Sequence, residues 1–176
     1  MRMPTPFKRF FREEGGNATV EFAILVPLLF AIFVATLEGG LMMSRWAGID
    51  RAADMVIRNL RLGQYENPDA ELLRQEICDQ VFLVENCFQN TAVDIREIDR
   101  ATFLMPDEDE PCVTREDEII QPVTEVTPGQ QNDLMLIRVC VTVDALFLTS
   151  RFAMEDLDAQ GGYALSVSSV YVNEPS

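Results

Sequence analysis

Residues 15–40 read GGNATVEFAILVPLLFAIFVATLEGG, and this stretch decides how the chain is organised. Its central 16 residues, 22–37, contain no charged side chain. As a helix they rise about 24 Å, slightly less than the roughly 30 Å hydrocarbon core of a bilayer. The sequence therefore predicts a membrane-spanning helix that extends a little beyond this run, with Glu21 or Glu38 near an interface.

Charges on the two sides of this helix predict its orientation. Residues 1–16 carry four basic and two acidic side chains, whereas the rest of the chain has a formal charge of −17, which gives the net charge of −15. By the positive-inside rule, the N-terminus stays in the cytoplasm and the acidic part is exported. No nucleic-acid partner is expected, because phosphate binding requires clustered cations.

Composition also argues against catalysis. The chain has no histidine, which removes the commonest neutral-pH general base and His-ligated zinc. Neither a P-loop nor a dinucleotide-binding glycine motif is present. We therefore predict a protein that is not an enzyme and that has no cofactor and no metal. The acidic run at residues 107–110 lacks the alternating spacing of a calcium loop and is expected to be a solvated loop.

Two simple interpretations compete at the apolar run. A secretory signal peptide should end in small residues of the A-x-A kind, but Glu38 and two glycines follow here. An uncleaved signal anchor agrees with the hydropathy. The residues before the run favour a third interpretation. A cut after Gly16 would give Asn17 a free α-ammonium one helical turn from Glu21, and a carboxylate at the mouth of a membrane helix usually marks a function.

This junction resembles the processing site of prepilins. A basic leader ending in Gly16, a glutamate at the fifth position after the cut (Glu21), an aromatic next to it (Phe22) and a long apolar helix are typical of prepilins cut by an aspartyl prepilin peptidase. The wider pattern is similar to the TadE-like pseudopilins of tight-adherence (Flp) pilus systems, in the residues Phe10-Phe11-Arg12-Glu13-Glu14, Ala23, Pro27, Arg51-Ala52-Ala53, Arg61-Leu62-Gly63-Gln64, Cys78, Cys87 and Val172-Asn173-Glu174-Pro175.

The resemblance implies a role for each part of the junction. The peptidase would remove residues 1–16 by cutting between Gly16 and Asn17. A cut after Gly15 is the alternative, although only the cut after Gly16 places Glu21 fifth. Glu21 and Phe22 would pair subunits, and the α-ammonium of a neighbouring subunit would neutralise the Glu21 carboxylate.

The resemblance also implies a function and partners. The chain would be a minor pilin-like (pseudopilin) component that acts in pilus assembly, surface adhesion and biofilm formation, because its body is larger than that of the major pilin of these systems. Its partners would be the prepilin peptidase, other pilins, the inner-membrane assembly platform and the membrane itself. The protein would lie in the inner membrane with its C-terminal domain in the periplasm or on the extracellular pilus. The alternative is an uncleaved bitopic protein with a disulfide-stapled exported binding or sensing domain.

A long amphipathic helix is predicted to follow the membrane segment, residues 17–44. Beyond it, apolar residues recur at spacings of three and four, while charged residues occupy the other faces. This stripe comprises Trp46, Ile49, Ala53, Val56 and Leu60. We expect one helix from about residue 18 to about residue 62 that ends at Gly63 and buries the stripe.

Shorter elements are predicted in the rest of the exported domain, residues 45–176. Asn67-Pro68-Asp69 is typical of an N-cap followed by proline at the first helical position, and it begins a second, short helix that includes Leu72, Leu73, Ile77 and Val81. Alternating apolar residues predict strands at 93–96, within 133–147 and at 163–172. The predicted fold class is therefore α+β, a pilin-like arrangement of a long N-terminal helix, a short helix and an antiparallel sheet.

Four cysteines in an exported domain allow three disulfide pairings. Cys78 and Cys87 are close in sequence, so we prefer the pairs Cys78–Cys87 and Cys112–Cys140. A metal site or redox pair is the alternative, but the spacings are not those of metal sites and no histidine is available.

Overall fold

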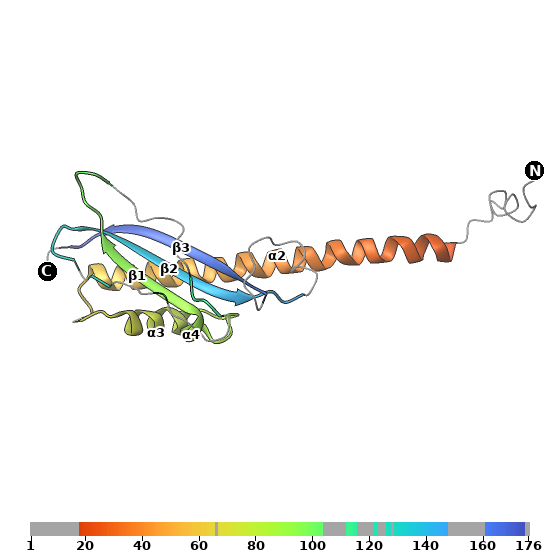
Figure 1. Ribbon diagram of the computed structural model, residues 1–176, viewed down its shortest axis with the longest axis horizontal. Helices are drawn as coiled ribbons and strands as arrows, with labels where there is room; N and C mark the ends of the chain where they lie inside the picture. Colours follow the sequence, from red (N-terminus) through yellow and green to blue (C-terminus); the bar gives the residue numbers. More distant parts are fainter. Residues whose placement is uncertain are drawn as a thin grey trace, which may run out of the picture. The chain divides into compact units, whose positions relative to one another are not determined.

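The computed structural model describes residues 18–65, 67–103, 112–115, 122, 126–127, 129–147 and 161–174. The leader, with Gly16 and Asn17, and the acidic run at 107–110 lie outside the described residues. Within them the chain order is α2 (Ala18–Arg61), α3 (Ala70–Gln80), α4 (Cys87–Asn90), β1 (Thr91–Glu97), β2 (Leu134–Asp144) and β3 (Gly162–Val172), as Figure 1 shows. The α+β prediction is therefore confirmed. Internal contacts divide the chain into two units, residues 1–37 and 38–176, which we call the anchor and the body.

Helix α2 is 44 residues long and continues through Pro27. It ends as the sequence predicts, because Gly63 has a φ of +63°, a left-handed conformation that glycine adopts without steric cost. The Gly63 N–H donates to the Leu60 carbonyl at 3.0 Å, and the Gln64 N–H donates to the Asn59 carbonyl at 3.0 Å. These two bonds satisfy carbonyl groups that the end of a helix otherwise leaves without donors.

Helix α3 begins at a different residue from the one predicted. The N-cap is Asp69 rather than Asn67, and Pro68 precedes the helix instead of occupying its first position. The Asp69 carboxylate accepts the Leu72 N–H at 2.8 Å. Aspartate in an extended conformation satisfies a first-turn N–H group well, so the helix starts after it. The expected last apolar residue, Val81, lies just beyond the helix in extended conformation.

Three antiparallel strands form a sheet in the order β1-β2-β3, so β2 is central. The register aligns Val93 with Val139 and Val139 with Val167. All three strands contain the segments predicted from alternation. The apolar face of β2 is fully buried and consists of Met135, Ile137, Val139, Val141 and Val143.

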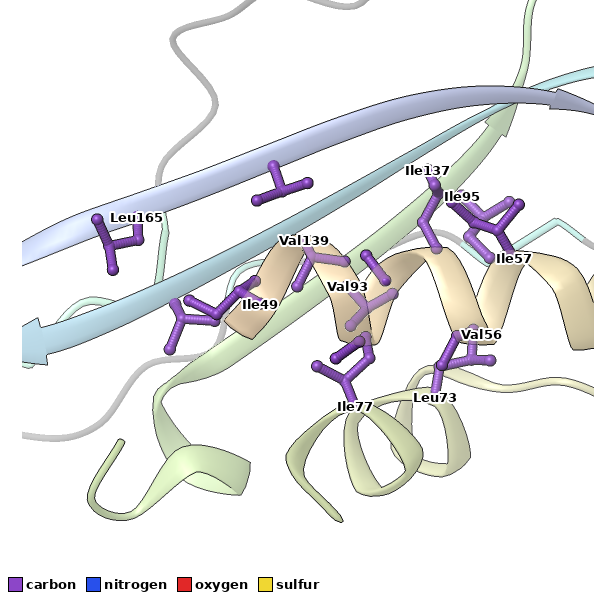
Figure 2. Close-up of a cluster of buried hydrophobic side chains, with 14 of the residues drawn as sticks. Ile49, Val56, Ile57, Leu73, Ile77, Val93, Ile95, Ile137, Val139 and Leu165 are labelled. Atoms are coloured by element: carbon purple, nitrogen blue, oxygen red, sulfur yellow. The ribbon is translucent and has the colours of Figure 1, made fainter. Parts of the chain in front are cut away.

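The core of the body lies on this face of the sheet. Helices α2 and α3 both contribute to it, as Figure 2 shows for Ile49 and Val56 of α2 and for Leu73 and Ile77 of α3. The expected stripe on α2 is correct from Ile49 onward, but Trp46 is 43% exposed and belongs to the surface. The Trp46 indole N–H instead donates to the Ser166 carbonyl on β3 at 3.4 Å.

The opposite face of β2 is covered by residues 112–115. The disulfide Cys112–Cys140 joins the two segments, and the Thr142 hydroxyl donates to the Val113 carbonyl at 3.3 Å. The second disulfide, Cys78–Cys87, joins α3 to α4. This is the pairing preferred from the sequence. Helix α4 itself was not predicted, because a single turn of four residues leaves no periodic pattern.

Candidate functional site

The head of the anchor carries the two described residues of the predicted processing and pairing site. Glu21 lies in the first turn of α2, where the positive end of the helix dipole favours a carboxylate. Phe22, next to it, is 68% exposed. Among the residues that the structure describes, the Glu21 carboxylate has no hydrogen bond or ion pair. The group is therefore available to a cation from outside this set of residues.

The rest of the anchor presents apolar side chains on every face. Its large hydrophobic residues are exposed, except for Val34, which is buried. A soluble core helix would bury one stripe, whereas a helix that is apolar all round requires lipid or other helices around it. In length and composition α2 is one helix that fits a single membrane crossing.

The first residue of the body, Glu38, is a buried carboxylate that sequence reasoning did not identify as such. Its side chain is 2% exposed. The backbone N–H groups of Leu146 and Phe147, just after β2, donate to its two carboxylate oxygens at 3.1 and 3.2 Å. Glu38 thus ties helix α2 to a segment 108 residues away, and each oxygen of its side chain has a donor.

Two turns further along α2, Arg45 donates hydrogen bonds to other segments of the body, whereas Glu38 accepts them. Its guanidinium donates to the Leu83 carbonyl at 2.9 Å, to the Asp144 carbonyl at 2.9 Å and to the Tyr163 hydroxyl at 3.0 Å. One planar cation therefore connects the α3–α4 loop, the end of β2 and the start of β3. Together, Glu38 and Arg45 fix the loops at this end of the body onto helix α2. No signal in the sequence identifies these contacts, because the accepting and donating groups are mostly backbone.

The other end of the body has a cavity of about 670 Å³ between α2 and β3. Its lining includes Asp54, Arg58 and Tyr171, and two further lining residues, Arg61 and Glu174, form an ion pair at 2.6 Å. Burial raises the pKa of Tyr171 to about 12. Charges of both signs line the cavity, and no cluster of three or more metal-ligating side chains occurs among the described residues. We assign no chemistry to it.

One family comparison matches this chain. The sequence model described as TadE-like protein matches residues 16–58, which are 43 of the 176 residues. The match begins at Gly16 and includes residues 16–37 of the anchor, Glu38, Arg45 and most of the amphipathic part of α2. The resemblance to TadE-like proteins is thereby confirmed for this segment. No curated protein and no solved structure matches.

Proposed function

Residues 16–58 are TadE-like, and on this premise we propose that the protein is an accessory pseudopilin of a tight-adherence type IV pilus. It acts in the assembly of the pilus and so in surface adhesion and biofilm formation. The observation that carries the proposal is the extent of the family match, which starts at Gly16 and continues through Glu21 and the whole apolar run. The proposal places residues 17–44 in the inner membrane and residues 45–176 in the periplasm or on the pilus.

Processing by a prepilin peptidase is the first step of this function. Hydrolysis of the peptide bond after Gly16 releases residues 1–16 and leaves Asn17 with a free α-ammonium. Glycine before the bond suits proteolysis, because the backbone can enter the protease in extended form without a side chain in the way. The new cation lies at the same end of the helix as Glu21.

Assembly uses the two charges that processing leaves at the head of the helix. In a bundle of anchors, the α-ammonium of one subunit neutralises the Glu21 carboxylate of its neighbour. Neutralisation matters because an unpaired carboxylate surrounded by apolar helices is costly. The exposed Phe22 and the apolar surface of the anchor pack against the other pilins and the inner-membrane assembly platform.

The body supports an accessory role. It is a packed α+β unit with its own core and two disulfides, and it is strongly acidic. Disulfides form and persist in oxidising compartments, which agrees with export to the periplasm. We propose no catalytic activity, no cofactor and no nucleic-acid partner for it.

The experiment that tests this function is mass spectrometry of the mature N-terminus, in cells with and without the prepilin peptidase. We expect a chain beginning at Asn17 with the peptidase and at Met1 without it. Gly16→Leu should block the cut, while the matched variant Gly15→Ala should still be cut before Asn17.

Two results would contradict the proposal. A chain that keeps residues 1–16 in cells with active peptidase would support the uncleaved bitopic protein instead. Unchanged processing of Gly16→Leu would show that the cut does not depend on this glycine. A mature chain beginning at Gly16 would move the cut by one residue and would displace Glu21 from the fifth position.

A further inference from the structure

Exposed apolar side chains gather on the loops that Glu38 and Arg45 hold. Phe82 is 70% exposed, and Leu83 and Leu146 are also exposed. Leu83 is attached through its carbonyl to Arg45, and Leu146 through its N–H to Glu38. We call Phe82, Leu83 and Leu146 the basal patch. Within the body, it lies on the segments that Arg45 and Glu38 of α2 contact.

The backbone of the basal patch is held in an unfavourable conformation. Leu83 has a φ of +69°, in the left-handed region that a leucine rarely adopts. The hydrogen bond from the Arg45 guanidinium to its carbonyl maintains this geometry at 2.9 Å. Strain of this kind persists where the surrounding structure imposes it, often at functional surfaces. The side chains of Phe82 and Leu83 at this position are both exposed.

The membrane span predicted from the sequence needs about four more residues to cross the hydrocarbon core. Those residues come either from before residue 22, which includes Glu21, or from after residue 37, which includes Glu38. Glu21 is exposed and has no partner among the described residues, whereas Glu38 is buried and accepts two N–H groups. Glu38 has donors of its own, whereas Glu21 depends on the cation of a neighbouring subunit, so the span of a single subunit extends on the C-terminal side.

If the span includes Glu38, then residues 146 and 147, which follow β2, lie at the level of the lipid chains. Residues 146 and 147 are one hydrogen bond from Glu38. Backbone N–H groups inside a bilayer must have an internal acceptor, and the Glu38 carboxylate supplies it for both residues. The exposed Trp46, two turns beyond Glu38, is of the residue type that is enriched at membrane interfaces.

We propose that the basal patch is a membrane-contact surface, with Leu146 inserted into the leaflet on the side of the body and held there by Glu38. The inference rests on the membrane anchor of the proposed function. The contact is with lipid chains rather than with charged headgroups, because the patch is apolar and the body is strongly acidic.

Tryptophan quenching by brominated lipids tests this contact in the full chain. The protein has a single tryptophan, so a Trp46→Phe background allows one reporter at a time. The reporters are Leu146→Trp in the patch, Leu29→Trp in the anchor and Val172→Trp at the opposite end of β3. Val172 is 44% exposed, which makes it a matched surface control.

In phosphatidylcholine vesicles, we expect bromines near the glycerol end of the chains to remove most of the Leu146→Trp fluorescence. Bromines near the chain ends should quench Leu29→Trp most, and Val172→Trp should remain unquenched. Phe82→Trp provides a second reporter in the patch and should be quenched from the shallow position as well. Adding Glu38→Ala should reduce the quenching of Leu146→Trp and leave that of Leu29→Trp unchanged.

Three outcomes would overturn the inference, and only one of them would also overturn the proposed function. If both patch reporters behave like Val172→Trp while Leu29→Trp is quenched, the anchor stands and the lipid contact is wrong. If Leu29→Trp is not quenched, the anchor is not in the bilayer and the proposed function fails with the inference. Protection of the patch reporters only after other pilins are added would assign the patch to a protein interface and would also overturn it.

Discussion

At the scale of single residues, Glu21 is the side chain on which pilus function should depend most directly. Glu21→Ala removes the carboxylate that the α-ammonium of a neighbouring subunit would neutralise, and so leaves that cation unpaired in the bundle. Breaking such a pair costs about 3 kcal/mol, so incorporation should fall by about two orders of magnitude. The measurement is the amount of protein in sheared pili, with Thr19→Ala from the same helical turn as the control.

This variant should still be inserted and cut, because the scissile bond and the apolar run are unchanged. Normal amounts of the Glu21→Ala protein in pili would remove the pairing role. Loss of insertion or of cleavage would assign Glu21 to an earlier step than assembly.

Tyr171 predicts how the stability of the body changes in alkali. Burial raises its pKa from the ordinary value of 10.0 to about 12 in the folded state. Below pH 10 both the folded and the unfolded chain keep the phenol proton. Between about pH 10 and pH 12 the unfolded chain loses this proton while the folded one retains it, so the stability falls as pH rises. Tyr171→Phe should make the urea midpoint less sensitive to pH in this interval.

Absorbance titration at 295 nm measures the same group without unfolding the protein. The difference between the original chain and Tyr171→Phe should show one transition near pH 12. A difference curve centred near pH 10 would mean that the phenol is solvated in the folded state.

The hydrogen-bond partners of Glu38 and Arg45 could not be predicted from the sequence. Charge and hydropathy place Glu38 beside an apolar run, which predicts only that Glu38 or Glu21 lies near an interface. Its burial depends on Leu146 and Phe147, which are more than a hundred residues away, and both contacts use backbone N–H groups. Backbone groups are present at every residue, so no sequence pattern points to these partners.

At the scale of elements, helix α3 offers a matched pair of substitutions. Leu73 is fully buried against the core, whereas its neighbour Leu72 is 37% exposed. Leu73→Ala should lower the free energy of unfolding by about 3 kcal/mol, because it removes buried methyl groups and leaves a cavity. Leu72→Ala should lower it by less than about 1 kcal/mol. Urea denaturation, followed by the fluorescence of Trp46, measures both.

Equal effects of the two substitutions would contradict the packing of α3 against α2 and the sheet. The comparison is sensitive because both variants make the same chemical change in the same helix. Helix propensity therefore cancels between them.

The elements that the sequence predicted are those with long, regular patterns. Eleven-residue β2, with every second side chain apolar, and the stripe of about three turns that begins at Ile49 on α2 are of this kind. The sequence predictions are wrong where a single hydrogen bond determines the end of an element. At the start of α3, for example, Asp69 is the N-cap and not Asn67. Trp46 followed the helical spacing, but it lies on the surface because its indole N–H can reach the Ser166 carbonyl of β3.

At the scale of the whole molecule, the structure combines an anchor whose surface is apolar all round with a body that has its own core. From the sequence we predict a membrane segment at residues 17–44 and an exported domain at residues 45–176, because hydropathy falls and charged residues return after the apolar run. The arrangement inside the body required knowledge of which strands pair, and the order β1-β2-β3 brings residues 91–97 beside residues 134–144 across an intervening segment. Loop closure over such distances leaves no local trace in the sequence.

The compartment of the body can be measured through its four cysteines. The structure places all of them in disulfides, Cys78–Cys87 and Cys112–Cys140. If the basic leader holds the N-terminus in the cytoplasm, the body reaches an oxidising compartment and both bonds persist. A maleimide-polyethylene glycol reagent should then add nothing to the denatured, unreduced protein and four groups after reduction.

Neutralising the leader with Arg2→Gln, Lys8→Gln, Arg9→Gln and Arg12→Gln should increase the fraction that reacts without reduction, because some chains then insert in the opposite orientation. Four reactive thiols in the unaltered protein would place the body in the cytoplasm and would reject the orientation on which the pilus function depends.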